Sequence, residues 1–562
     1  MNSLNKTPPN PRSIRERANE IIFVLVLCLG QFLSLAGIMQ TVSPVLILAN
    51  YFDIHDYGSL SWFSAAYSLT VGTFILPAGR VGDMYGHKRV LTAGWAWFAI
   101  WSFACGFCSS KQLVLFSVFR AFQGIGPALV IPNAIAIIGR TFPVGLKRNI
   151  AFACFSAAGP TGAALGAVMA ALVAETISWH WCFRLLGISC ALLVPVSHWI
   201  IPNPDLPFPL DSEEPPQFDW PGAVTGMVGL VLVNFSLNQA PLIGWTEPYV
   251  LILFAIGLSS LAAFAWVEFR VAAQPIIPMR GLQRSAAFAL ACVFAGWSSH
   301  GIWVYYFYIF LEHLRGQSAL ISSVEMTPAA VTGVCFAFLA VWLMRRVAVS
   351  CVMFFSMCFF ALGSLLMATA PLRQTYWGQT FFAVALIPGA MNLSFPAATI
   401  LLSSALPKEK QGIAASLVAT VVNYSISCGL GLAGSIHKQA AIYAAQENGL
   451  QGDPPALSVT NPQLVTVRLF GLRSAYWFSV ALGVLGMVIA AVFLLVQRFG
   501  ADESGRTRRD EARKSVAESE KMDVEYGPKK LPKVSTSSTT FYIGDKIIED
   551  MKQHKFSVTV GH

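Results

Sequence analysis

Long apolar runs, separated by short polar segments, make up most of this chain. A helix that crosses a bilayer needs about 20 consecutive apolar residues, and fourteen runs come near that length. They lie near residues 21–48, 58–78, 90–109, 112–138, 150–174, 182–201, 220–239, 249–268, 288–310, 320–344, 348–369, 375–402, 411–437 and 474–497. The seventh is the weakest, because Asn234, Asn238 and Gln239 make its end polar. The pattern predicts an all-α integral membrane protein with 14 transmembrane helices.

The composition makes a lipid bilayer the expected partner of the chain. Apolar residues make up 55% and charged residues 12% of the sequence, and the mean hydropathy is +0.59. An ordinary soluble domain has about 25% charged residues, so this much apolar surface cannot be buried in one aqueous core. The net charge of +9 needs no nucleic-acid partner, because much of it comes from the loop residues described next.

Lysine and arginine gather on alternate loops, which is the positive-inside pattern of membrane proteins. In chain order these groups are Lys6, Arg12, Arg15 and Arg17; Arg80, Lys88 and Arg89; Arg140, Lys147 and Arg148; Arg270, Arg280 and Arg284; Arg345 and Arg346; and Lys408 and Lys410. The exception is the acidic segment 202–219, which has no basic residue. An even number of helices places it on the same side as the N-terminal tail (1–20), so both termini are expected to be cytoplasmic.

A repeated pattern indicates two related halves. Residues 132–151 and 396–414 each contain two prolines eleven residues apart, a basic turn and a new helix start. The copies fall on corresponding runs if one helix pair is inserted between two parallel repeats, an architecture that many transporters share. We therefore expect a six-helix first half (21–201), an inserted pair (220–268) and a six-helix second half (288–497).

Two further segments are expected to lie outside the membrane. Residues 438–473 are predicted to form the longest outer loop, with Pro454 and Pro455 favouring irregular structure. Residues 498–562 mix both charges densely, which is typical of a disordered cytoplasmic tail. That tail is either a phosphorylated control segment or a passive solvated one.

The most specific feature is the charged segment from Gly79 to Arg89, between the second and third runs. It resembles the loop after the second helix of the major facilitator superfamily, written roughly G-x-x-x-D-[RK]-x-G-x-[RK]-[RK]. The matching residues are Gly79, Asp83, Gly86, Lys88 and Arg89, and Met84 stands where a basic residue is usual. The resemblance implies a cytoplasmic gate of the outward-facing state, held by Asp83 and its basic neighbours Arg80, Lys88 and Arg89. The alternative is a loop that is positive only for topology.

A second motif starts at Arg120 and includes Gln123. It resembles the R-x-x-Q-G-x-G signature of the fourth helix of that family. An arginine inside a spanning helix costs about 2.5–3.5 kcal/mol even on insertion scales. Arg120 should therefore face a polar cavity or partner, and the resemblance implies a role in proton coupling. The alternative is a side chain that snorkels to the membrane interface.

The fifth run carries a segment of small residues that resembles the exporters' G-P-x-x-G-G motif. Gly159 and Pro160 match it, Ala163 and Ala164 replace the glycine pair, and Gly162 and Gly166 add further small positions. Small residues at these spacings let helices pack closely. In the family this motif accompanies export.

Taken together, residues 20–497 resemble the fourteen-helix drug:proton antiporter branch, and most of all the fungal aminotriazole-resistance and borate-efflux transporters. Many members carry an aspartate in the first helix that is implicated in coupling. Alignment on Pro44 places Leu35 at that position. The chain therefore either uses a different titrating group or is a facilitator without proton coupling.

The resemblance also implies that the first, fourth, ninth and twelfth helices line a central cavity. The polar candidates on them are Gln31, Gln40, Arg120, Gln123, Asn133, Trp297, His300, Tyr305, Tyr306 and Asn392. His300 can change charge near physiological pH, unless it is a neutral histidine bonded within the bundle. Glu325 is a second candidate for the proton, unless it is a helix-start residue near the outer surface. Few acidic groups favour a neutral or weakly acidic substrate over a strongly cationic one.

We therefore expect a secondary transporter that exports a small toxic or metabolic compound, with protons as the expected second ligand. The plasma membrane is the expected location, and the vacuolar membrane is the alternative. No catalytic cluster or metal-ligand set stands out on the inner loops, so neither an enzyme nor a cofactor is expected. A transporter-like sensor that signals through residues 498–562 remains the main alternative.

Overall fold

The computed structural model describes residues 14–54, 57–109, 112–143, 145–202, 218–272, 274–277, 284–404, 411–450 and 462–526. Helices account for the regular structure in these ranges, and no strand occurs within them. The prediction of an all-α protein is confirmed.

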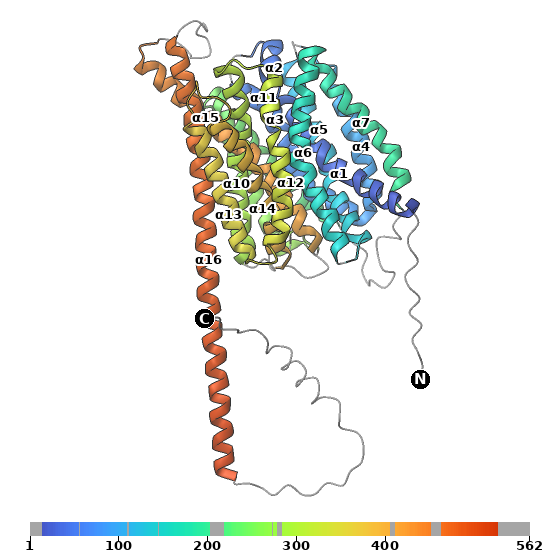
Figure 1. Cartoon of the computed structure of the whole chain (residues 1–562), viewed down its shortest axis with the longest axis vertical. Coiled ribbons are helices and arrows are strands. Elements are labelled where there is room, and N and C mark those ends of the chain that lie inside the picture. The colour runs from blue at the N-terminus through green and yellow to red at the C-terminus, as the bar shows by residue number, and fades with distance from the viewer. Residues whose placement is uncertain are drawn as a thin grey trace, which may run out of the picture. The chain divides into compact units, whose positions relative to one another are not determined.

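The helices follow one another with few interruptions (Figure 1). We call α1 to α7 the first half: α1 (Ile14–Val42), α2 (Val45–Phe52), α3 (Tyr57–Tyr85), α4 (His87–Gly106), α5 (Leu113–Thr141), α6 (Leu146–Thr176) and α7 (Trp179–Ile200). The inserted pair is α8 (Trp220–Ile243) and α9 (Pro248–Trp266), which continues as the π-helical turn η1 (Val267–Val271). We call the rest the second half: α10 (Arg284–Ile309), the π-helical turn η3 (Phe310–Leu314), α11 (Ala319–Glu325), α12 (Pro328–Leu343), α13 (Val349–Ala368), α14 (Gln379–Ser404), α15 (Gln411–Glu447) and α16 (Pro462–Tyr526).

Thirteen helical stretches of the described residues are long and apolar enough to cross a membrane. They coincide with thirteen of the fourteen predicted runs, so a multi-pass membrane protein is confirmed. The remaining run, near 90–109, coincides with α4, a 20-residue helix that is not among the thirteen. The count of fourteen spanning helices therefore stays a prediction.

The charged segment after the second run differs from the predicted loop, because most of it is helical. α3 continues through Asp83 to Tyr85, and only Gly86 separates it from α4. Gly86 has a φ of 96°, which glycine adopts without the steric cost that a Cβ would add. One residue therefore makes the whole turn between the two helices.

Helices also extend into the two segments that were expected to lie outside the membrane. α15 reaches Glu447 and α16 begins at Pro462, so the predicted outer loop (438–473) is helical at both ends. α16 continues into the predicted disordered tail as far as Tyr526. Residues 451–461 and 527–562, and most of the acidic segment 202–219, lie outside the described residues.

The two ends of the helix bundle can be told apart by the helices and residues that they carry. α1 ends at Val42 and α2 starts at Val45, because Pro44 has no N–H with which to continue the first helix. Figure 1 shows α2 and α11 at the same end, which we call the opposite end. The end that carries Gly86 and Arg140 is called the basic end.

Candidate functional site

A cavity of about 960 Å³ lies between the two halves and reaches the basic end. Its wall contains residues of α1, α3, α4, α5 and α6 from the first half and of α10, α14 and α15 from the second. Residues 274–276, which follow η1, complete the wall. A movement of one half against the other therefore changes the shape of this cavity.

The wall is mostly apolar but carries a set of polar side chains. They are Gln31, Ser34, Arg80, Asp83, His87, Arg140, Arg148, Ser156, Gln274, Trp297, Asn392, Thr399, Ser403, Ser416 and Asn423. This set contains three arginines and a single carboxylate. The excess of positive charge suits a neutral or anionic small molecule better than a strongly cationic one.

Asp83 stands at the mouth of the cavity and connects three helices. Its Oδ1 lies 2.8 Å from Nη2 of Arg140 on α5 and 3.3 Å from Nε2 of His87 on α4. The other ring nitrogen of His87 lies 2.7 Å from Oδ1 of Asn133. Asp83 and Arg140 keep 34% and 46% of their side-chain exposure, so solvent reaches the mouth.

Arg80 holds a different partner at the same mouth. Its Nη2 donates to Oε1 of Gln274 at 2.6 Å, which ties α3 to the segment after the inserted pair. Asp83 thus forms its ion pair with Arg140 in this state and lies near the ring of His87, and its ion pairs among the described residues do not include Arg80, Lys88 or Arg89. The gate that the sequence predicts belongs to the outward-facing state, so it stays a prediction.

The opposite end is closed by hydrogen bonds between the halves. The hydroxyls of Ser43 and Ser323 lie 2.8 Å apart, and the Ser43 hydroxyl also bonds the carbonyl of Ala167. The backbone N–H of Leu46 donates to Glu312, and that of Leu320 donates to Glu175 at 2.8 Å. The cavity therefore opens at one end of the bundle and is sealed at the other.

Glu325 lies at this closed end and not in the cavity wall. Its Oε1 accepts a hydrogen bond from Gln317 at 3.0 Å, and its carbonyl accepts one from the hydroxyl of Tyr376 at 2.6 Å. Burial, and then the charge of Glu325, raise the pKa of Tyr376 above its ordinary value, so the phenol stays a donor. Glu325 is the last residue of α11 and lies in the first part of the spanning stretch Ala319–Leu343, so its role as a proton carrier stays a prediction.

Arg120 is fully buried, so the snorkelling alternative is wrong. Its Nε donates to the carbonyl of Phe63 at 2.9 Å, and its two terminal nitrogens donate to Gln123 and Thr41. The guanidinium carbon lies 4.5 Å from the centroid of the Tyr67 ring. No carboxylate pairs with Arg120 among the described residues, so neutral acceptors and an aromatic face stabilise this cation.

The other predicted cavity residues divide into two groups. Gln31, Trp297 and Asn392 line the cavity. The rest are buried outside its wall: Gln40, Gln123, Asn133, His300, Tyr305 and Tyr306. Gln40 donates to the carbonyl of Cys182 at 2.8 Å, and the imidazole of His300 packs edge-on against the indole of Trp297 at 5.5 Å.

The small-residue segment of α6 lies against both halves. A Cβ on Gly162 would meet the carbonyl oxygen of Phe32 at 2.3 Å, and one on Gly166 would meet Cα of Ala36 at 2.6 Å, so α1 runs directly over these glycines. Pro160 lies on the other side, against Gly333 of α12. The predicted packing motif is thus placed where α6 meets α1 and α12, and Gly159 faces Gln31 beside the cavity.

Several polar residues of the site were missed by the sequence reasoning. Arg140 and Arg148 were counted only as topological charges, although the helix ends that carry them reach the cavity. Asn423 belongs to α15 and Gln274 to a short linker, and neither carries a pattern that would set it apart. Glu312 lies two residues beyond the run predicted at 288–310, so the hydropathy pattern does not single it out.

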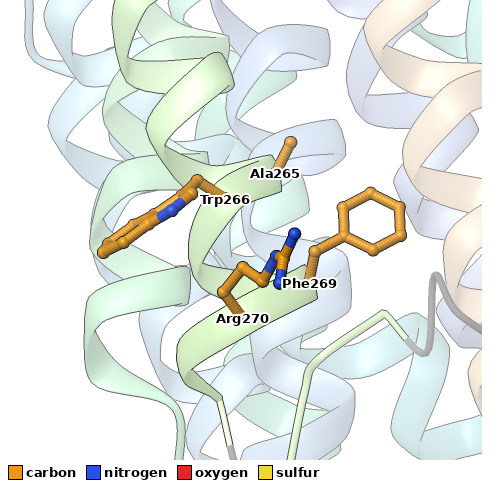
Figure 2. Close-up of a pocket in the computed structure, with 4 residues that line it drawn as sticks. All are labelled: Ala265, Trp266, Phe269 and Arg270. Atoms are coloured by element: carbon orange, nitrogen blue, oxygen red, sulfur yellow. The ribbon is translucent and has the colours of Figure 1, made fainter.

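A second hollow lies beside the end of α9 (Figure 2). Ala265 and Trp266 of α9 and Phe269 and Arg270 of η1 line it, and Trp266 and Phe269 point to different sides of the helix. One helix end supplies all four side chains, so this hollow is a groove on the surface of the bundle and not a site between the halves.

The sequence profile of the Major Facilitator Superfamily matches residues 27–432. A low affinity ammonium transporter of Saccharomyces cerevisiae is 42% identical over 480 residues, which cover 84% of this chain and 88% of that protein. The aminotriazole resistance protein of the same yeast is 34% identical over 440 residues, which cover 77% of this chain and 80% of that protein.

A solved structure shares the same fold at low sequence identity. The crystal structure of a POT family transporter in complex with a thioalcohol-conjugated peptide superposes with a TM-score of 0.58. The two sequences are 14% identical, and the match covers 86% of this chain and 96% of that one.

Proposed function

The chain belongs to the major facilitator superfamily, a family of membrane transporters rather than enzymes, and we propose that it exports a small toxic or metabolic compound in exchange for protons. The observation that carries this proposal is the cavity between the halves. It reaches the basic end, while hydrogen bonds between the halves seal the opposite end. This is the arrangement that one state of an alternating-access cycle requires.

The charge of the cavity wall supports a neutral or weakly acidic substrate. Arg80, Arg140 and Arg148 outnumber the single carboxylate of Asp83, and the remaining polar groups are amides, hydroxyls and an indole. A boric-acid-like or aminotriazole-like compound matches these donors and acceptors. The relative named for aminotriazole resistance points to the same class.

The direction of transport is inferred from the fifth run and from the basic residues. The Gly159-Pro160 segment resembles the exporters' motif and lies where α6 meets α1 and α12. The positive-inside rule places the basic end in the cytoplasm, so the cavity would load its substrate from inside the cell. The resemblance to fungal exporters is what leads us to place the protein in the plasma membrane, with the vacuolar membrane as the alternative.

Flux into inside-out vesicles tests this proposal. The vesicles would be offered boric acid, aminotriazole and methylammonium, each with and without an imposed proton gradient. Uptake of a neutral compound that stops when the gradient is dissipated is the expected result. Uptake of methylammonium alone would instead favour a function like that named for the ammonium transporter.

One observation favours a second candidate, a facilitator without proton coupling. Leu35, which stands where many antiporters have an aspartate, lines the cavity itself. The wall therefore offers no carboxylate at that position of α1. Substrate flux that ignores the proton gradient in the same vesicles would select this candidate.

A further inference from the structure

A buried carboxylate lies in the sealed end of the bundle and takes no part in the cavity. Glu312 belongs to the π-helical turn η3, and only 4% of it is exposed. π-helical turns within spanning helices occur frequently at functional sites. Packing alone therefore does not explain why a carboxylate is buried at this position.

The two oxygens of this carboxylate have unequal surroundings. Oε2 accepts a hydrogen bond of 3.3 Å from the backbone N–H of Leu46, in the first turn of α2 and in the other half of the molecule. Oε1 is buried and has no hydrogen-bond partner within the part of the chain that the structure describes. Burying a charged carboxylate whose oxygen has no hydrogen bond costs much more free energy than burying the same group in its protonated, neutral form.

The titratable groups around Glu312 do not supply a compensating charge. Glu175 of α6 is the other acid whose charge acts on it, and Tyr308 of α10 is the neighbouring phenol. No basic side chain forms an ion pair with Glu312 in the described ranges. The N-terminus of α2 favours a negative charge modestly, whereas Glu175 opposes one.

We propose that Glu312 is a proton-binding site that links the pH of the outer solution to closure of the opposite end. Before that end closes, a proton from the outer solution forms an O–H bond with Glu312, and closure then buries the neutral acid. When the halves separate there, the bond to Leu46 breaks, water reaches the carboxylate and the proton leaves to water. Low outer pH therefore favours the closed end and high outer pH favours the open one. This inference does not require that transport itself be proton-coupled.

The test is a distance measurement across the opposite end in proteoliposomes. Spin labels would be placed at Asn50 on α2 and Arg373 between α13 and α14, which are exposed residues of different halves. In the wild type, the ratio of long to short distances should rise with pH by up to about tenfold per pH unit, the limit for one proton. Glu312→Gln, which mimics the protonated acid, should stay closed and change less than about twofold across that range.

Three controls separate proton binding from a general weakening of the contact. Glu325→Gln removes another carboxylate of this end and should keep the pH response of the wild type. Ser43→Ala removes the cross-half bond to Ser323 and should favour the open end at every pH with the slope unchanged. Glu312→Asp retains an acid and should retain a pH response with a displaced midpoint.

Two results would overturn the proposal: a wild type whose distances ignore pH, or a Glu312→Gln variant that responds as the wild type does. If Glu312→Gln does not fold, infrared difference spectra at two pH values give a second reading. We expect a protonated-carboxyl band that shifts in the Glu312→Asp variant and keeps its position in the Glu325→Gln variant. A band that Glu312→Asp leaves unchanged would contradict the proposal. If substrate flux does not depend on the proton gradient while the spin-label distances still respond to pH, the proposed proton exchange is wrong but the role of Glu312 stands.

Discussion

Arg120 shows at the level of single residues how this bundle holds a buried cation without a carboxylate. Three acceptors and two aromatic rings, those of Tyr67 and Phe183, surround the guanidinium, and the acceptors come from α1, α3 and α5. The planar fork of an arginine reaches several acceptors at fixed angles, which an ammonium group cannot do. The side chain therefore joins three helices of the first half.

Arg120→Lys tests this role. The lysine keeps the charge but leaves at least one acceptor unpaired, so we expect a loss of about 2 kcal/mol in stability. Thermal unfolding of the purified protein in detergent measures it as a lowered Tm. Arg148→Lys is the matched control, because Arg148 lines the solvated cavity, and its Tm should stay close to that of the wild type. Equal effects of the two variants would contradict the structural role.

Asp83→Asn tests the predicted gate at the same scale. The Asp83–Arg140 pair is half exposed, and such pairs contribute about 0.2–1 kcal/mol, so the fold should tolerate the change. We expect export to fall by at least about fivefold, which corresponds to about 1 kcal/mol, while substrate affinity stays within a few fold. Export is measured as vesicle flux and affinity by equilibrium binding. Lost binding with normal conformational exchange would argue against the gate.

Some residues of the cavity could be predicted from the sequence and others could not. Gln31, Trp297 and Asn392 could be predicted, because they are polar residues on helices that the family resemblance places around the cavity. Asn423 and Gln274 were not, since their position depends on how α15 and the linker pack. The role of His300 stays a prediction, because its imidazole lies behind Trp297 and outside the wall.

At the level of elements, hydropathy located the helices well and their ends poorly. Each apolar run coincides with helical structure, because a spanning segment must satisfy its backbone hydrogen bonds internally. The ends extend further, since charged residues such as Asp83 do not stop a helix and Gly86 alone suffices for the turn. The mixed charges after residue 497 did not exclude a helix either. Opposite charges four residues apart, as at Asp502 and Arg506, favour one.

The contact of α1 with α6 gives a prediction about elements. A methyl group on Gly162 would meet backbone atoms of Phe32 at 2.3 Å and 2.7 Å, so Gly162→Ala must move one helix away from the other. We expect a loss of about 1–3 kcal/mol, as for other overpacked contacts, and slower transport. Tm and vesicle flux measure the two effects.

Gly139→Ala is the control for that substitution. Gly139 is also a helical glycine, but the nearest atoms to its Cβ position lie at 3.6 Å and 3.8 Å, which is ordinary van der Waals distance. Its variant should keep the wild-type Tm. A Gly162→Ala protein as stable as the control would show that α1 and α6 adjust freely at this contact.

At the level of the whole molecule, the open basic end and the sealed opposite end imply that transport requires Ser43 and Ser323 to separate. Their hydroxyl oxygens lie 2.8 Å apart, close enough for cysteines at the two positions to be tested as a disulfide. Oxidation of a Ser43→Cys/Ser323→Cys variant should hold the opposite end closed and abolish flux. A reductant should restore flux, and substrate binding from the basic end should persist throughout, because the cavity stays open there.

The control for this cross-link lies within the second half. Ser299 and Ser364 have hydroxyls 3.1 Å apart on α10 and α13, so a Ser299→Cys/Ser364→Cys disulfide joins helices that belong to one half. Oxidation of this variant should leave flux close to that of its reduced form, because the halves can still move against each other. If the cross-half disulfide forms and flux continues, the opposite end does not need to open. The two halves would then not act as the alternating gates of this transporter.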